Sequence, residues 1–244
     1  MRIPRIYTPQ TLAPGVHLTI AGQSAHHVIH VLRLRTGALV RIFDGNGTEH
    51  NATLMDIKRS EIILETGQPV TIIPESLLQV TLLQGIARND RMDLILQKAV
   101  ELGIQNFQPL WMQRSQSRLN NDRLEKRIDH WQGIITSACE QCGRATMPIL
   151  EPPVGFTEWL GTTKYNGLYL MLQPDSEISL GNIKRPRGNI HILVGPEGGL
   201  SPDEQALARN AEFQGIRLGP RVLRTETAAL AALAGMQTLW GDFN

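Results

Sequence analysis

The chain has 244 residues, of which 41% are hydrophobic and 19% are charged, and its formal net charge at pH 7 is +1. This composition is typical of a soluble globular protein with one large or two modest domains. It excludes a globally basic protein that coats nucleic acid, so RNA binding would need local basic patches. No apolar stretch is long enough to span a membrane, and the first ten residues lack the apolar core of a signal peptide, so we expect a cytoplasmic protein without a membrane partner.

Residues 1 to 70 carry the pattern of a small β-domain. Alternating apolar residues predict a strand over 16–20, and further strands are expected over 39–43, 48–57 and 61–64. Apolar residues at helical spacing over 25–32 predict a short helix, for which Ser24 is a suitable N-cap. Several short strands around one helix predict a small barrel.

Basic residues cluster in this N-terminal part. Arg and Lys most often form an ordinary solvated surface, but in a domain that binds RNA they contact phosphates. On that ground we expect RNA contacts at Arg2, Arg5, Arg33 and Arg35. The motif His-His-x-x-His over residues 26–30 places two imidazoles on one helix face, but no third ligand is evident, so no metal is expected.

The segment from Pro69 to Pro74 is interpreted as an extended linker, because two prolines interrupt it. Beyond it, buried strands alternate with amphipathic helices. Strands are expected over 80–85, 107–111 and 167–172, and helices with apolar faces over 92–102 and 124–142. This alternation predicts an α/β domain with a parallel sheet.

The stretch from 189 to 229 contains two strands that each end in a glycine-bearing loop. The first strand, Ile190–Val194, runs into Gly-Pro-Glu-Gly-Gly and then into a helix with Ser201 as N-cap and Glu204 three residues later. The second, Ile216–Leu218, leads to an Ala-rich helix over Thr225–Trp240 with few polar residues, which predicts burial. Ligands bind at such carboxyl ends in open α/β sheets, although ordinary strand-to-helix turns have the same composition.

Three stretches are more specific: GPEGG followed by LGPRVLRTETA, RMDLILQKAVELGIQNFQPL, and ACEQCGRATMP. Together they resemble the RsmE family of SPOUT RNA methyltransferases, and the resemblance covers essentially the full length. It implies a PUA-like RNA-binding β-barrel domain over residues 1–70 and a SPOUT α/β methyltransferase domain over 75–244, with a C-terminal trefoil knot at about 190–229. It also implies a homodimer that uses S-adenosyl-L-methionine to methylate N3 of a uridine in small-subunit (16S) ribosomal RNA.

The resemblance and the positions of the loops also imply two sets of binding residues. The cofactor is expected to contact Leu172, Gln173, Val194, Gly195, Pro196, Glu197, Gly198, Gly199, Leu218, Gly219, Val222, Leu223, Arg224, Thr225, Thr227 and Ala228. The RNA-facing side of the active site is expected to include Lys98, Glu101, Arg114, Glu140, Gln141 and Arg144. For Glu101 and Glu140, solvation or pairing with a nearby arginine is the alternative.

The reaction implied by the resemblance needs a group that handles a proton. Uracil N3 is protonated at neutral pH, so a base or a stabiliser of the developing anion is expected. Arg224 is suited to stabilise an oxyanion at the uracil carbonyls, and Glu197 or Glu226 to accept the proton. Capping of the last helix is an alternative role for Glu226, and the sequence does not choose between the two carboxylates.

Other functions remain open from the residues. Cys139 and Cys142 form a Cys-x-x-Cys, but there is no second pair for a zinc site, so buried or partly buried thiols are expected. The alternatives are a SPOUT enzyme that acts on another RNA position and a non-catalytic RNA-binding factor in ribosome assembly. A nucleotide-dependent oxidoreductase is disfavoured, because no Gly-x-Gly-x-x-Gly opens a helix after the first strand.

Overall fold

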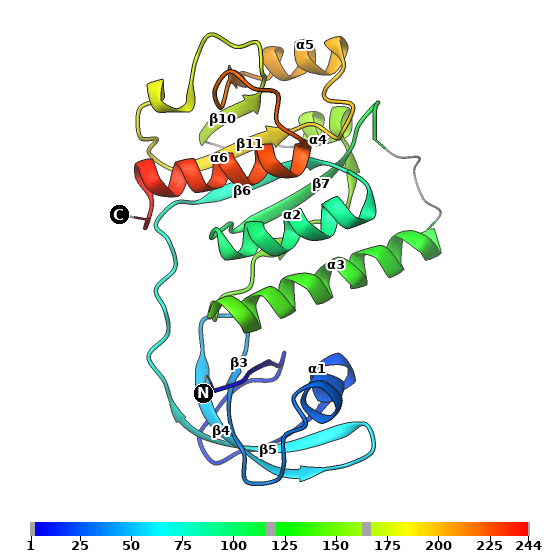
Figure 1. The fold of residues 1–244 in the computed structure, drawn as a ribbon, viewed down its shortest axis with the longest axis vertical. Helices are drawn as coiled ribbons and strands as arrows, with labels where there is room; N and C mark the ends of the chain where they lie inside the picture. The colour runs from blue at the N-terminus through cyan, green and yellow to red at the C-terminus, as the bar shows by residue number, and fades with distance from the viewer. Residues whose placement is uncertain (1–2, 116–120, 163–166, 244) are drawn as a thin grey trace. The chain divides into compact units, whose positions relative to one another are not determined.

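The computed structural model describes residues 3–115, 121–162 and 167–243. The chain forms two compact units, which are coloured along the sequence in Figure 1. Unit 1 contains Met1–Glu75 together with Ile135–Met147, and unit 2 contains Ser76–Ile134 together with Pro148–Asn244. The first change of unit comes after Glu75, and the return of residues 135–147 to unit 1 was not predicted. The predicted domains over residues 1–70 and 75–244 stay a prediction.

Unit 1 is built on one five-stranded sheet. Its strands are β1 (Arg5–Tyr7), β2 (His17–Ala21), β3 (Leu39–Phe43), β4 (Glu49–Ile57) and β5 (Glu61–Pro69), in the order β1-β3-β4-β5-β2. All neighbours are antiparallel except β1 and β3. Alternate residues of all five strands meet in one core, and irregularities in the β4–β5 register bend the sheet around it. The predicted strands are thus present, β5 is longer than expected, and β1 was missed.

The predicted short helix of unit 1 has a different start and shape. Helix α1 covers Gly22–His26 and continues as a π-helical turn, η1, over His27–Val31. The prediction that Ser24 caps this helix is wrong, because Ala21 is the N-cap residue and Ser24 lies inside α1. Gly22 has a φ of +69°, which glycine adopts without strain, and this lets the chain leave β2 and turn directly into the helix.

Unit 2 is a parallel α/β domain. Its strands are β6 (Val80–Gly85), β7 (Asn106–Trp111), β8 (Ile149–Leu150), β9 (Val154–Gly155), β10 (Gly167–Leu172), β11 (Asn189–Val194) and β12 (Gln214–Ile216). Its helices are α2 (Asn89–Glu101), α3 (Asn121–Cys142), whose end belongs to unit 1, α4 (Phe156–Thr162), the short 3-10 helix η2 (Leu180–Asn182), α5 (Pro202–Asn210) and α6 (Thr225–Trp240). The strand order is β12-β10-β11-β6-β7-β8, with β9 beside β7.

Helices cover both faces of this sheet. Residues of α4 and α5 pack on Leu83, Met171 and Leu193 of the central strands. On the other face, α6 contacts β11 and α2, and α2 and α6 run side by side (Figure 1). The central strands are therefore buried on both faces, which is why they read as continuous apolar runs in the sequence.

The order of the strands creates a switch point. Strand β11 lies between β10 and β6, although β7 and β10 intervene between β6 and β11 in the chain. The carboxyl ends of β6, β10, β11 and β12 consequently meet at one edge, where ligands bind in open α/β sheets. This order is consistent with the predicted trefoil knot over residues 190–229, whose threading stays a prediction.

Two details of unit 2 differ from the prediction. The last strand was expected over Ile216–Leu218 but covers Gln214–Ile216, and Gly215 pairs with Met171 instead of preceding the strand. This strand has only three residues at an edge of the sheet, so its pairing with β10 fixes its bounds more than its own apolar residues do. The short elements β8, β9 and α4 were not predicted, since they are too brief to show a period.

Candidate functional site

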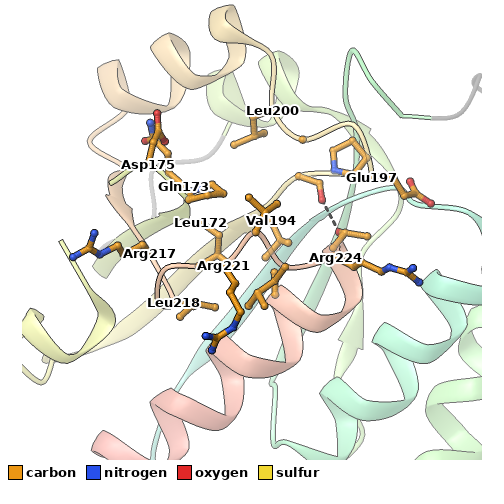
Figure 2. Close-up of a pocket in the computed structure, with 18 of the residues that line it drawn as sticks. Leu172, Gln173, Asp175, Val194, Glu197, Leu200, Arg217, Leu218, Arg221 and Arg224 are labelled. Atoms are coloured by element: carbon orange, nitrogen blue, oxygen red, sulfur yellow. Dashed lines mark hydrogen bonds between the residues drawn. The ribbon is translucent and has the colours of Figure 1, made fainter. Parts of the chain in front are cut away.

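A pocket of about 460 Å³ lies at the carboxyl ends of β10, β11 and β12, within unit 2. Figure 2 shows Leu172 and Gln173 from the end of β10, Val194 from β11, and the loop residues Leu218, Arg221 and Arg224 around one hollow. Every residue predicted to contact the cofactor lines this pocket except Thr227, which is exposed on α6. The volume lies within the range of small-molecule sites, roughly 300–1,000 Å³.

The glycines of the first loop allow the chain to close tightly around the pocket. A Cβ atom on Gly195 would lie 2.9 Å from the backbone N of Leu200, and a Cβ on Gly85 would lie 2.7 Å from the backbone N of Pro196. Gly199 has a φ of +67° and open space at its Cβ position, on the side that lines the pocket. The loop is thus packed against β6 at Pro196, and the backbone at Gly199 is accessible to a ligand.

Two polar side chains tie this loop to the start of α6. Thr225 Oγ1 donates to the carbonyl of Gly195 at 2.6 Å and accepts from Nε2 of Gln84 at 3.0 Å. Gln84 is fully buried at the end of β6. The two loops that line the pocket are therefore connected through β6, and Gln84 is a contributor that the sequence analysis missed.

Charged side chains gather at one side of the pocket. Glu197 and Arg224 extend toward the same side in Figure 2, above the beginning of α2. Glu197 Oε1 accepts the backbone N–H of Arg88 at 2.9 Å and lies 3.7 Å from Nη1 of Arg91. Nε of Arg91 lies 4.0 Å from Oε2 of Glu226. Glu226 itself does not line the pocket, so the structure separates the two carboxylates that the sequence left equivalent.

Comparison with known proteins gives matching models for both units. Residues 74–237 match the model of an RNA methyltransferase domain, and residues 20–66 match that of an RNA methyltransferase PUA domain. The ribosomal RNA small subunit methyltransferase E of Buchnera aphidicola (from Acyrthosiphon pisum) is 31% identical over 242 residues, which are 99% of this chain and 96% of that protein. The chain belongs to the ribosomal RNA small subunit methyltransferase E family.

Solved structures of similar proteins agree with this assignment. The family member from Neisseria gonorrhoeae, bound to S-adenosyl methionine, is 41% identical with a TM-score of 0.92, and 100% of each chain is covered. The methyltransferase Lpg2936 from Legionella pneumophila, in complex with the same cofactor, is 34% identical with a TM-score of 0.95 and the same coverage. The predicted family and fold class, a SPOUT-type α/β domain preceded by a PUA-like domain, are confirmed.

Several residues that line the pocket were not among the predicted cofactor contacts. They are Arg91, Pro174, Asp175, Leu200, Gln205, Ile216, Arg217 and Arg221. Arg91 comes shortly after β6, whose carboxyl end lies beside those of β10 and β11. Ligands bind at the carboxyl ends of neighbouring parallel strands, so Arg91 could have been predicted if the order of the strands had been known.

The residues predicted to face RNA in unit 2 have separate positions. Arg114 is exposed and donates to the carbonyl of Gly198 at 2.7 Å, so it lies beside the pocket loop. Lys98 and Glu101 pair with each other at 2.7 Å on α2 and do not line the pocket. Two turns of helix separate Lys98 from Arg91, a distance of about 10 Å along the axis.

In unit 1, three of the predicted RNA contacts are engaged inside the protein. Arg5 is buried, forms an ion pair of 2.8 Å with Glu49, and donates to the carbonyls of Cys139 and Arg144. Arg144 pairs with Glu75 at 2.7 Å, and its side chain is 9% exposed. Glu140 accepts the N–H of Tyr7, and burial raises its pKa above the usual range.

These contacts give the Arg5 guanidinium a role in holding unit 1 together, and its predicted contact with an RNA phosphate stays a prediction. Among the residues described, the remaining predicted RNA contacts of unit 1 differ from these three in their exposure to solvent. Gln141, Arg33 and Arg35 are exposed, and Arg2 lies outside the described residues. The backbone of Arg33 has a φ of 50°, which is uncommon for a residue other than glycine.

The imidazoles of the histidine motif and the thiol of Cys139 have different surroundings. His26 and His30 have ring centroids 4.5 Å apart, but no group of three or more possible metal ligands occurs in the part of the chain that is described. Cys139 is buried, and burial raises its pKa to about 12, which makes it a poor nucleophile. None of the described helices is long and apolar enough to cross a membrane.

Proposed function

We propose that the pocket of unit 2 binds S-adenosyl-L-methionine and that the protein uses it to methylate N3 of a uridine in small-subunit (16S) ribosomal RNA. The observation that carries the proposal is the pocket itself, formed by two loops at the carboxyl ends of β10, β11 and β12. Two similar structures with 41% and 34% identity are bound to this cofactor, and the curated relatives are named as small-subunit ribosomal RNA methyltransferases.

The residues present fit this cofactor. Apolar side chains of Leu172, Leu218 and Ala228 line the cavity and suit a purine ring, and the open side of Gly199 exposes backbone groups for the polar parts. Asp175 and Gln173 add a carboxylate and an amide at one rim, as Figure 2 shows. The side chains on the pocket wall are therefore of the types that an amphiphilic nucleoside needs.

When bound, the cofactor supplies an electrophilic methyl group on a sulfonium. The protein must hold the uracil in line and remove the N3 proton, while the electron pair of the N–H bond stays on N3 to form the new N–C bond. The electron pair of the broken bond between sulfur and the methyl carbon would stay on sulfur, so the leaving group is S-adenosyl-L-homocysteine. In this proposal Glu197, which lines the pocket, accepts the proton and passes it to water. Arg224, on the same side, stabilises charge on a uracil carbonyl.

The proposal is tested by incubating the protein with labelled cofactor and either naked 16S RNA or small ribosomal subunits. We expect one labelled nucleoside, which mass spectrometry identifies as N3-methyluridine. Methylation of N3 blocks Watson–Crick pairing, so reverse transcription should stop at the same site. A label on a ribose hydroxyl or on guanine would contradict the predicted position, and cofactor binding without transfer to either substrate would favour the non-catalytic assembly factor.

We also propose that the chain acts as a homodimer. Apolar side chains are exposed on the two neighbouring helices of unit 2, at Leu94 of α2 and Leu239 of α6, and at Phe243 after α6. Exposed apolar side chains that form one patch are typical of protein interfaces, and we propose that these three belong to such a patch. Light scattering should give twice the mass of the chain, and a monomeric mass at micromolar concentration would contradict this proposal.

A further inference from the structure

Three charged side chains beside the pocket, Glu226, Arg91 and Glu197, are joined by two ion pairs. The side chain of Glu226 is 12% exposed, that of Arg91 is 27% exposed, and that of Glu197 is 25% exposed. Arg91 and Glu197 line the pocket, whereas Glu226, at the start of α6, does not.

Glu226 has few partners of its own. Its Oε2 atom is buried and has no hydrogen bond to any described residue, and its ion pair is with Nε of Arg91 at 4.0 Å. A buried carboxylate oxygen without a hydrogen bond is costly unless nearby positive charge compensates it. The N-terminus of α6 and the Arg91 guanidinium both supply such charge, and the ion pair with Glu226 in turn orients the guanidinium.

Arg91 in turn acts on one oxygen of Glu197. Oε1 of Glu197 lies 3.7 Å from Nη1 of Arg91 and accepts the Arg88 N–H at the start of α2. Both contacts orient the carboxylate. Oε2 has no hydrogen bond to any residue in the described ranges, which leaves it available to a proton donor.

We propose that Arg91 and Glu226 are positioning residues that hold Glu197 oriented for proton acceptance. This rests on the proposed function, because it assigns partners to the carboxylate that removes the N3 proton. Glu226 acts through Arg91 and does not touch the uracil, so it is not an alternative base. Other ionisable side chains on neighbouring segments include Arg88 and Asp90 at the start of α2, Arg114 after β7 and Arg224 before α6.

The first test compares kcat and KM of the wild type, Arg91→Gln and Arg91→Lys at saturating cofactor. Arg91→Gln removes a group that orients Glu197, so we expect kcat to fall about tenfold or more while the KM for RNA stays within about threefold. Arg91→Lys retains the charge and should restore kcat in part, because an ammonium group does not contact two carboxylates in the geometry of a guanidinium.

The second test is a double-mutant cycle. Glu226→Gln should lower kcat, and Arg91→Gln/Glu226→Gln should be no slower than Arg91→Gln alone, because Glu226 acts through Arg91. Arg209→Gln removes an exposed arginine on α5 and serves as the control, with unchanged kinetics. If Arg91→Gln does not fold, Arg91→Lys and Glu226→Gln are combined in the same cycle.

Calorimetric titration with the cofactor separates this inference from the proposed function. Because Arg91 lines the pocket, each variant is titrated first and its kcat is then measured at saturating cofactor. A kcat of Arg91→Gln equal to that of the wild type, or multiplicative effects in the cycle, would overturn the inference while wild-type methylation stands. A wild type that binds the cofactor and methylates no uridine N3 would overturn the proposed function instead.

Discussion

At the scale of single residues, glycines determine how closely the pocket loop approaches its surroundings. Gly195 has no space for a side chain, because a Cβ atom there would lie 2.9 Å from the Leu200 backbone N and 3.0 Å from the carbonyl carbon of Gly199. Gly161 in α4 has open space at the same position. The two glycines therefore provide a matched pair for substitution.

We predict that Gly195→Ala weakens cofactor binding at least about tenfold, because the loop must shift to accommodate the methyl group. Gly161→Ala should leave binding unchanged and should stabilise α4 slightly, since alanine favours helix. Calorimetric titration and thermal unfolding of both variants check this. Equal cofactor affinities for the two variants would show that the loop can shift to accommodate the methyl group without weakening cofactor binding.

His191 is a second residue whose surroundings determine its chemistry. Its ring stacks on Tyr169 at 4.8 Å and lies 6.5 Å from Trp159, and burial lowers its pKa from 6.5 to about 4. The folded protein therefore keeps the imidazole neutral in a range in which the unfolded chain binds a proton. This favours folding fully above pH 6.5, and the contribution is lost as the pH falls from 6.5 toward 4.

We predict that the free energy of unfolding of the wild type falls by about 2 kcal/mol more than that of His191→Phe between pH 7.5 and pH 5.0. Phenylalanine retains the ring contacts and cannot titrate. Urea unfolding of both proteins at the two pH values measures the difference, and the other histidines cancel in the comparison. Parallel losses in the two proteins would contradict a neutral, buried His191.

At the scale of elements, the pocket depends on a connection between β6, the loop after β11 and the start of α6. Gln84 and Thr225 provide this connection through hydrogen bonds that meet at the Gly195 carbonyl. Thr238 lies on the same helix, and its hydroxyl donates only to the Ala234 carbonyl one turn earlier. The helix therefore offers both a test position and a control.

We predict that Thr225→Val weakens cofactor binding about tenfold and lowers the free energy of unfolding by roughly 1–3 kcal/mol, because the buried Gln84 amide loses one of its acceptors and the Gly195 carbonyl loses the hydroxyl donor. Thr238→Val should change neither quantity by more than about 0.5 kcal/mol. Titration and denaturant unfolding measure both effects. A similar change in both variants would mean that the hydroxyl of Thr225 has no special role at the pocket.

At the scale of the whole molecule, the cofactor pocket lies within unit 2, and the exposed arginines predicted to bind RNA phosphates lie in unit 1. Arg33→Gln/Arg35→Gln should therefore weaken RNA binding and reduce its salt dependence by about one unit of slope per lost phosphate contact. Cofactor binding should be unchanged. Filter binding at several salt concentrations measures this, and an unaltered salt slope would place the phosphate contacts elsewhere.

Sequence patterns predicted the long elements well and the short ones poorly. The strands Val80–Gly85 and Gly167–Leu172 have the predicted bounds, because each is a buried apolar run with clear breaks. Strands β1, β8 and β9 have two or three residues, and their existence depends on a neighbouring strand. The loop residues from Gly195 to Gly199 line the pocket. The sequence patterns did not indicate Gln84, which lies in β6, or Arg91, which lies in the first turn of α2.

The sequence by itself determined the α/β pattern of the longer part, the β pattern of the first 70 residues and the membership of the family. These follow from apolar periodicity and from motifs that are contiguous in the chain. Tertiary structure decided which charged groups meet, because contacts such as Arg5 with Glu49 and Arg91 with both Glu197 and Glu226 join residues far apart in sequence. Burial then decides their roles, since a paired guanidinium inside unit 1 stabilises the fold and one beside the pocket orients a carboxylate.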